Sequence, residues 1–143
     1  MWIIDSSVYI RAFNDADFGE ELKRFHAANL PRIILSAVVV FELLAASRNA
    51  TAERRLRKGL LQPYQKRGRM HVPNPSTWEM AAHLDQRLRK RRAAGKLAER
   101  ALSNDLLISA SACQVGATVV CERGGDLAKI AQLLDIEHAF PWP

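Results

Sequence analysis

Cysteine is scarce in this sequence, which has only Cys113 and Cys121 among its 143 residues. Neither belongs to the paired Cys and His spacing of a zinc site, and no secretion signal accompanies them. The sequence therefore gives no support for a zinc centre or a disulfide framework. We expect both side chains to be small buried hydrophobic groups.

Long apolar runs are also missing. The two longest, residues 33–41 and 112–121, are interrupted by polar residues and fall short of the roughly 20 apolar residues that cross a bilayer. The first five residues carry no basic segment and already include Asp5, which is unlike a signal peptide. We expect a cytoplasmic protein that makes no membrane contact.

Several familiar motifs are absent as well. There is no glycine-rich dinucleotide motif or P-loop, so a nucleotide cofactor has no support, and no Gly-x-Ser-x-Gly segment that would indicate a serine hydrolase. Internal repeats, low-complexity segments and convincing linkers are missing too, so the length fits a single domain covering residues 1–143.

The charge is unevenly distributed. Lys and Arg number 21 against 15 Asp and Glu, a net charge of +6. Between Arg54 and Arg100 there are fourteen basic residues and three acidic ones, so the remainder of the chain is acidic. A basic middle segment suggests a polyanionic partner such as a nucleic acid. Solvated helix faces are the plainer alternative.

Apolar segments with strand and helix patterns alternate along the chain. Strands are expected at residues 1–4, 32–35, 70–72, 117–121 and 136–140, and helices at 6–13, 17–29, 37–48, 51–67, 76–92, 103–116 and 125–134. This alternation predicts an α/β fold in which helices cover both faces of a mostly parallel sheet of four or five strands. Ligand sites in such sheets lie beyond the carboxyl ends of the strands. Asp5 and Asp126 follow two of those ends.

Two other acidic residues stand in apolar surroundings. Glu42 is the only charged residue in segment 37–46, and Asp105 is the only one in segment 103–110. Glutamate is seldom buried unless it is paired or bound to a metal. Structural explanations remain open, because Glu42 could pair with an arginine and Asp105 could favour a helix N-terminus.

A cluster of these carboxylates would have a definite chemistry. Carboxylates brought together repel one another unless a cation lies between them. Oxygen ligands without Cys or His select magnesium or manganese over zinc, and such an ion can activate water and stabilise charge on a phosphodiester. The sequence leaves the choice between one and two metal ions open.

Four segments, taken in order, resemble the acidic motifs of PIN domains, and in particular those of VapC-type toxins of type II toxin–antitoxin systems. In the first, Asp5 is followed by two serines, and in the second a serine precedes Glu42 by six residues. The likeness extends from residue 1 to about residue 130. The segments are residues 3–10, 35–43, 104–112, and 116–121 followed by 126–130.

The last motif departs from the family pattern. VapC-type proteins usually have Thr, any residue, then Asn or Asp after the fourth strand, whereas this chain has Cys121, Glu122 and Arg123. Leu127 also replaces the usual Phe. Because an arginine cannot bind a cation, Asp126 is the best fourth acid, with Glu122 as its substitute.

The resemblance implies a three-layer PIN-like fold and a magnesium-dependent endoribonuclease, with manganese as a possible replacement. Asp5, Glu42 and Asp105 would bind the metal directly, and Asp126 directly or through water. Ser7 and Asn104 would be supporting polar residues, and a helix-capping role is an equally open interpretation of both.

The resemblance also implies partners. RNA would be the substrate, and the basic residues that could follow its backbone are Arg54, Arg55, Arg57, Lys58 and Arg89. A homodimer is expected, as is a cognate antitoxin that inserts an Arg or Lys into the acidic pocket. Phe13, Phe18 and Leu22 could form that interface or belong to the core, and Tyr64 could stack on a base.

Two other functions remain to be weighed. A nucleic-acid-binding module with a degenerate metal site would explain the altered fourth motif. A phosphoreceiver with Asp5 as acceptor would need further acids before the end of the first strand and a lysine after a late one. Neither feature occurs in this sequence.

Overall fold

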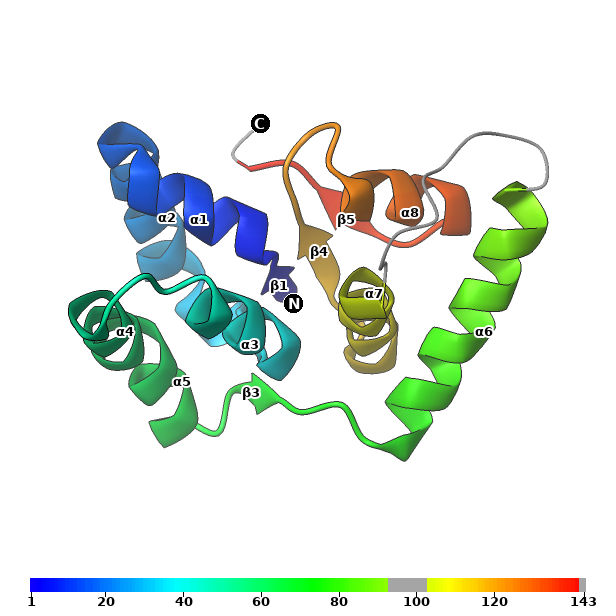
Figure 1. The fold of residues 1–143 in the computed structure, drawn as a ribbon, viewed down its shortest axis with the longest axis horizontal. Helices are drawn as coiled ribbons and strands as arrows, with labels where there is room; N and C mark the ends of the chain where they lie inside the picture. The colour runs from blue at the N-terminus through cyan, green and yellow to red at the C-terminus, as the bar shows by residue number, and fades with distance from the viewer. Residues whose placement is uncertain (93–102, 142–143) are drawn as a thin grey trace.

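The computed structural model describes residues 1–92 and 103–141. Figure 1 shows short central strands with helices on either side of them. The final part of the basic segment noted in the sequence, from residue 93 to residue 100, lies outside the described residues. No helix in the described ranges combines the length and the apolar character that crossing a bilayer requires.

The strands found in the described residues are all parallel to their neighbours. They are β1 (Trp2–Ile4), β2 (Leu35–Ser36), β3 (Met70–His71), β4 (Thr118–Val120) and β5 (His138–Ala139). One sheet has the order β1-β4-β5, and β2 pairs with β3 in a second. A parallel bridge between Trp2 and Ile33 joins the two sheets. The expected α/β class with a parallel sheet is therefore confirmed, although the strands are short and divide into two sheets.

The helices occupy the segments in which they were expected. They are α1 (Ser6–Asn14), α2 (Ala16–Asn29), α3 (Ala37–Ala45), α4 (Ala50–Leu56), α5 (Gln62–Lys66), α6 (Pro75–Arg92), α7 (Ser103–Val115) and α8 (Asp126–Leu134), with a short 3₁₀ turn η1 (Leu30–Arg32). In Figure 1, α1 to α5 lie on the left of the strands and α6 and α8 on the right, with α7 between α3 and α6.

Helix α3 forms although three consecutive valines favour a strand. Ser36 caps it, because its hydroxyl oxygen accepts a hydrogen bond from the Val38 amide at 3.2 Å. Val39 is fully buried, and Val38, Val40 and Leu43 also face the core. Capping and burial together outweigh the local strand preference.

The basic helix expected at 51–67 is divided. A π-helical turn, η2 (Arg57–Leu61), separates α4 from α5, and the Gln62 amide donates to the Arg57 carbonyl five residues earlier. Pro63 lies in the first turn of α5. Its ring has no N–H and crowds the preceding turn, which a widened π turn accommodates.

Apolar spacing predicts that α6 turns five residues toward the core, and the structure confirms three of them, Ala81, Leu84 and Leu88, but not Trp78 and Ala82. Its core-facing positions are Thr77, Ala81, Leu84 and Leu88. Trp78 was expected in the core, but it is rotated away from this stripe and is 58% exposed. Cys121 is buried as expected, whereas Cys113 is exposed in the last turn of α7, after the buried run of that helix ends at Ala112.

Candidate metal centre

Asp5 lies where β1 ends and α1 begins. Its amide donates a hydrogen bond to the Val120 carbonyl of β4 at 2.8 Å, which fixes it at the carboxyl edge of the sheet. Its side chain caps α1, because Oδ2 accepts from the Ser7 amide at 3.2 Å and from the Ser7 hydroxyl. Asp5 is only 6% exposed. Ser7 therefore holds a buried carboxylate in place at this edge.

Glu42 faces the same region from α3 and is supported from α7. Asn104 Nδ2 donates to Glu42 Oε1 at 3.0 Å. Glu42 Oε2 is buried, and no partner for it exists among the described residues. An unsatisfied buried carboxylate oxygen is unfavourable unless a cation or a donor reaches it. Asn104 therefore supports Glu42 through this hydrogen bond.

The electrostatics of Asp105 show that four acidic residues share one neighbourhood. Burial is the largest cause that raises the pKa of Asp105 from 3.8 to about 7, followed by the negative charges of Asp5, Glu42 and Asp126. Burial and the charge of Glu42 also raise the pKa of Asp5, against the hydrogen bonds from Ser7. These acids come from the end of β1 and from α3, α7 and α8, so the fold brings together carboxylates that are far apart in sequence.

The two candidates for the fourth acid differ in their surroundings. Asp126 is in the first turn of α8, is exposed, and contacts Lys129 Nζ at 3.2 Å. Glu122 forms an ion pair with Arg11, whose Nη1 lies 3.2 Å from Oε2. Asp126 is among the charges acting on Asp105 and Glu122 is not, so Asp126 is the better placed of the two.

The donor set fits a hard divalent cation. All four acids offer oxygen, and the nearby thiol of Cys121 stays protonated, since burial and then the charges of Asp5, Glu122 and Asp105 raise its pKa to about 12. Within the described residues, no three His, Cys, Asp or Glu side chains stand close enough to hold a metal ion as placed. The unsatisfied Glu42 Oε2 and the raised pKa of Asp105 are both relieved by a cation.

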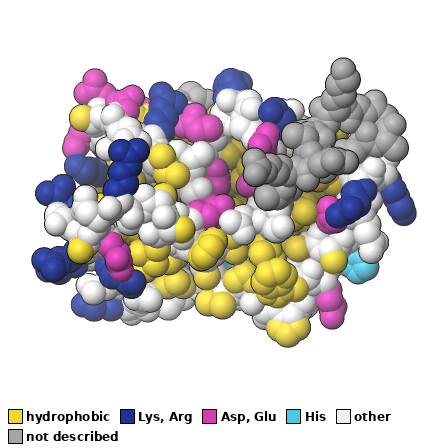
Figure 2. Space-filling view, in the orientation of Figure 1, with side chains coloured by type: hydrophobic (Ala, Val, Ile, Leu, Met, Phe, Trp, Pro, Cys, Tyr) yellow, Lys and Arg dark blue, Asp and Glu magenta, His cyan; other side chains and the backbone are white. Residues whose placement is uncertain are grey.

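The basic residues singled out from the sequence are exposed on three elements, of which α4 and η2 are contiguous and α6 is separate. Arg54 and Arg55 lie on α4, Arg57 and Lys58 on η2, and Arg89 on α6. Figure 2 shows Asp and Glu side chains along the middle of the viewed face, with Lys and Arg side chains mostly toward its margins. The basic residues therefore flank an acidic centre instead of forming one continuous patch.

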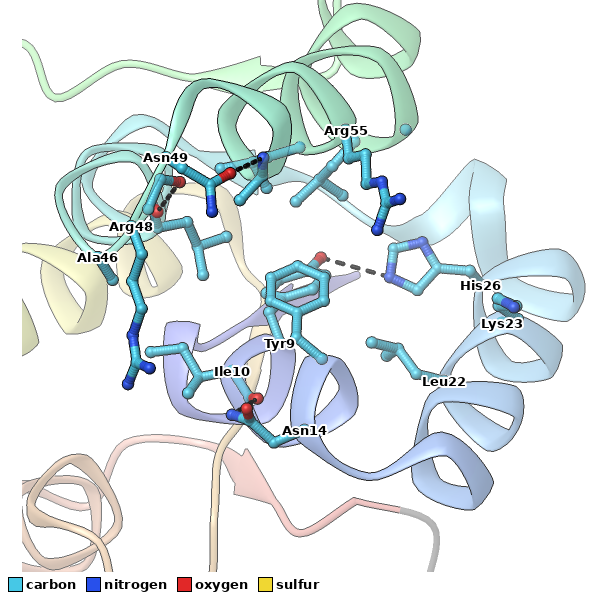
Figure 3. A pocket seen from close by; sticks show the side chains of 17 residues that line it. Tyr9, Ile10, Asn14, Leu22, Lys23, His26, Ala46, Arg48, Asn49 and Arg55 are labelled. Carbon is cyan, nitrogen blue, oxygen red and sulfur yellow. Dashed lines mark hydrogen bonds between the residues drawn. The ribbon is translucent and has the colours of Figure 1, made fainter.

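A separate pocket lies between α1 and α2 on one side and α4 and η2 on the other (Figure 3). Its volume is about 890 Å³, and none of the four acids lines it. The lining is mainly apolar, and it includes Phe13, which is 63% exposed, whereas Phe18 is buried in the core. Basic side chains also line it: Lys23, Arg48 and Arg55. The pocket was not predictable from the sequence, because its walls come from several helices.

Two tyrosines and a histidine form a hydrogen-bonded group beside this pocket. The Tyr9 hydroxyl lies 3.3 Å from His26 Nε2, and the Tyr64 hydroxyl lies 3.1 Å from His26 Nδ1. Burial lowers the pKa of His26 to about 4, so the ring is neutral at pH 7. Tyr64 is buried in this group, which does not favour stacking of its ring on a base.

Comparison with known proteins identifies the family of this chain. The sequence pattern of the family described as "PIN domain" matches residues 2–133. The chain belongs to the PIN-domain family. No curated protein sequence matches it significantly.

Solved structures share the fold of this PIN domain at low sequence identity. A chain of FitAcB from Neisseria gonorrhoeae is 22% identical over 99% of both chains, with a TM-score of 0.73. A chain of DNA-bound VapBC from Salmonella typhimurium is 15% identical over 97% of this chain and 96% of that one, with a TM-score of 0.69. A chain of VapBC2 from Rickettsia felis, solved with a promoter DNA fragment, is 16% identical over 99% and 98%, with a TM-score of 0.65.

Proposed function

We propose that this PIN-domain protein is a magnesium-dependent endoribonuclease and the toxin of a cytoplasmic toxin–antitoxin pair. The observation that carries the proposal is the convergence of Asp5, Glu42 and Asp126 on Asp105. Four carboxylates sharing one field at a sheet edge are costly unless they bind a cation. Membership of the PIN family and the exposed basic residues on α4 and α6 support the same function.

Asp5, Glu42 and Asp105 would hold Mg²⁺ or Mn²⁺, with Asp126 as the fourth acid. The bound ion would supply an activated water and charge stabilisation at an RNA phosphodiester. Ser7 holds Asp5 by two hydrogen bonds, and Asn104 leaves Glu42 with one free oxygen. These contacts would orient the Asp5 and Glu42 carboxylates, which would still have to draw closer to hold an ion.

Cleavage of a structured RNA such as tRNA by the partner-free protein tests the proposal. Cleavage with MgCl₂ or MnCl₂, and none with EDTA, is the expected result. Failure to cleave several RNAs that the protein nevertheless binds would favour the other candidate, a nucleic-acid-binding module with a degenerate metal site. The observation that favours this candidate is Arg123, which lies over the Phe140 ring at 4.1 Å where the family usually has Asn or Asp.

Asp126→Asn is expected to lower the affinity of the site for magnesium without abolishing cleavage. Asp126 is exposed and contacts Lys129, so its contribution is smaller than that of the buried acids. We expect roughly a tenfold rise in the Mg²⁺ concentration at half-maximal cleavage, the range found for outer ligands. Titration of cleavage with MgCl₂ measures it. If that Mg²⁺ concentration is unchanged in Asp126→Asn and rises in Glu122→Gln, Glu122 is the fourth acid.

The pocket in Figure 3 supports the antitoxin as partner. Its apolar lining and its basic residues, Lys23, Arg48 and Arg55, would suit an apolar segment that carries acidic residues. The relatives with this fold were solved as FitAB and VapBC complexes.

Phe13→Asp is therefore expected to reduce capture of the antitoxin. Phe13 is exposed at the pocket, so the change adds a buried charge to the complex without disturbing the core. Co-expression with the reading frame next to the gene, followed by affinity purification, measures the effect. Ala28→Asp, at an exposed position of α2 outside the pocket lining, should leave capture intact, and equal capture by Phe13→Asp would contradict the assignment.

Exposed apolar side chains elsewhere support a homodimer. Phe41 on α3, Val72 after β3 and Trp78 at the start of α6 are each more than half exposed. Figure 2 shows hydrophobic side chains gathered below the middle of the face, where these elements lie in Figure 1. Contiguous apolar surface of this kind commonly marks an interface.

Trp78→Asp is expected to convert a dimer into a monomer. The change places a charge at the centre of an interface whose energy would come mainly from buried aromatic area. Light scattering of the purified protein measures the mass. Asp85, further along α6, provides a control, and Asp85→Asn should remain a dimer. A monomeric unsubstituted protein would rule the proposed interface out.

A further inference from the structure

Glu122, in the altered fourth motif, forms an ion pair with Arg11 of α1, and neither residue has a role in the proposed metal site. Arg11, in the last turn of α1, donates from Nη1 to both carboxylate oxygens of Glu122, at 3.2 and 3.4 Å. The guanidinium carbon also lies 4.0 Å from the centre of the Phe18 ring. Two independent contacts thus fix the position of an arginine whose side chain remains 49% exposed.

This pair lies at the edge of the sheet that carries the carboxylates. Val120, at the end of β4, accepts a hydrogen bond from the Asp5 amide, and Glu122 follows two residues later. Glu122 also directly follows Cys121, whose side chain is buried beside this edge. Arg11 therefore places a positive charge at the border of the acidic cluster.

RNA cleavage at such a cluster has an electrostatic problem. Four carboxylates carry more negative charge than one divalent ion neutralises, and the substrate is itself an anion. The basic residues on α4 and α6 attract RNA but lie toward the margins of the molecule. A cation beside the cluster is needed to hold the phosphate group near the metal.

We propose that Arg11 is a substrate-positioning residue that binds an RNA phosphate next to the metal site, with Glu122 orienting it. This inference rests on the proposed ribonuclease function. Arginine suits the role, since its planar guanidinium group with five N–H donors matches a phosphate group. In Arg11, both hydrogen bonds to Glu122 come from Nη1. Arg123, the other arginine of this region, lies over Phe140 instead.

Steady-state cleavage of one labelled RNA oligonucleotide with MgCl₂ tests the inference. Arg11→Gln should raise KM by roughly tenfold or more, the loss expected for a charged hydrogen bond, with little change in kcat. The plot of log KM against log NaCl should lose about 0.7 from its slope, the amount for one phosphate contact on a single strand. Arg11→Lys should restore part of the KM. Arg24→Gln, a change at an exposed arginine of α2 near Glu20, should change neither quantity.

Glu122→Gln separates this role from a metal-binding one. The amide keeps an oxygen for Arg11 and removes a negative charge, so KM should stay the same or fall, and the Mg²⁺ concentration at half-maximal cleavage should not change. Wild-type KM and salt slope in Arg11→Gln would overturn the inference while leaving the ribonuclease intact. A rise in the Mg²⁺ concentration at half-maximal cleavage in Glu122→Gln would overturn the inference too, because Arg11 would then be the partner of a metal ligand. If the unsubstituted protein cleaves no RNA, both proposals fail.

Discussion

The rate of RNA cleavage is expected to fall by at least about 100-fold in an Asp5→Asn protein. This is more than the roughly 10- to 100-fold loss that is typical of residues hydrogen-bonded to metal ligands. Asn keeps the size of the side chain and is as good a helix cap as Asp. The hydrogen bonds from Ser7 and the start of α1 should therefore survive. What the substitution removes is the negative charge that would face the metal.

The readout is the cleavage rate of a structured RNA at saturating MgCl₂, with RNA affinity and the melting temperature Tm measured alongside. We expect RNA affinity to be kept or improved, because one negative charge near the substrate is gone. Asp15→Asn is the matched control, since Asp15 also caps a helix but lies outside the acidic cluster. Full activity in Asp5→Asn would refute the proposed role of Asp5.

An Asp105→Asn protein is expected to be more stable than the unsubstituted chain in EDTA. The pKa of Asp105 is about 7 in the folded protein, against an ordinary value of 3.8. Between these values the folded state holds more protons than the unfolded state, so the stability contributed by Asp105 falls as pH rises. Above pH 7 the whole penalty of burial and like charge is present, and Asn removes it.

The gain should be on the order of 2 kcal/mol at pH 8, after allowance for partial solvent screening. That corresponds to a rise in Tm of roughly 5 °C, and it should vanish as the pH is lowered toward 4. Adding MgCl₂ should stabilise the unsubstituted chain and leave Asp105→Asn unchanged. Asp85→Asn, which breaks an exposed pair with Arg89, should be slightly less stable at either pH. A lower Tm for Asp105→Asn in EDTA at pH 8 would contradict the account.

Much of the fold follows from the sequence, because apolar periodicity and breaking residues act locally. Alternating strands and helices predict the parallel sheet, and Ser36 explains why the valines of α3 form a helix. The division into two sheets was not predictable, since it depends on how many residues of each strand form backbone pairs with the neighbouring strand. Trp78 was misassigned because one residue of offset around a helix moves a side chain by about 100°.

The candidate site was predictable to a similar extent. Asp5 and Asp126 follow strand ends, and Glu42 and Asp105 interrupt apolar segments, so position and context single them out. The partner of Asn104 depends on how α3 and α7 are rotated against each other, which no local pattern specifies. The same holds for the contact between Arg11 and Glu122, which are 111 residues apart in sequence.

Calorimetric titration of the purified protein with MnCl₂ tests the central claim, that these carboxylates form a site for a divalent cation. The account predicts saturable binding to the unsubstituted chain, its loss in Asp5→Asn and in Asp105→Asn, and its retention in Glu122→Gln. Equal binding by all of these proteins, or none by the unsubstituted chain, would contradict it.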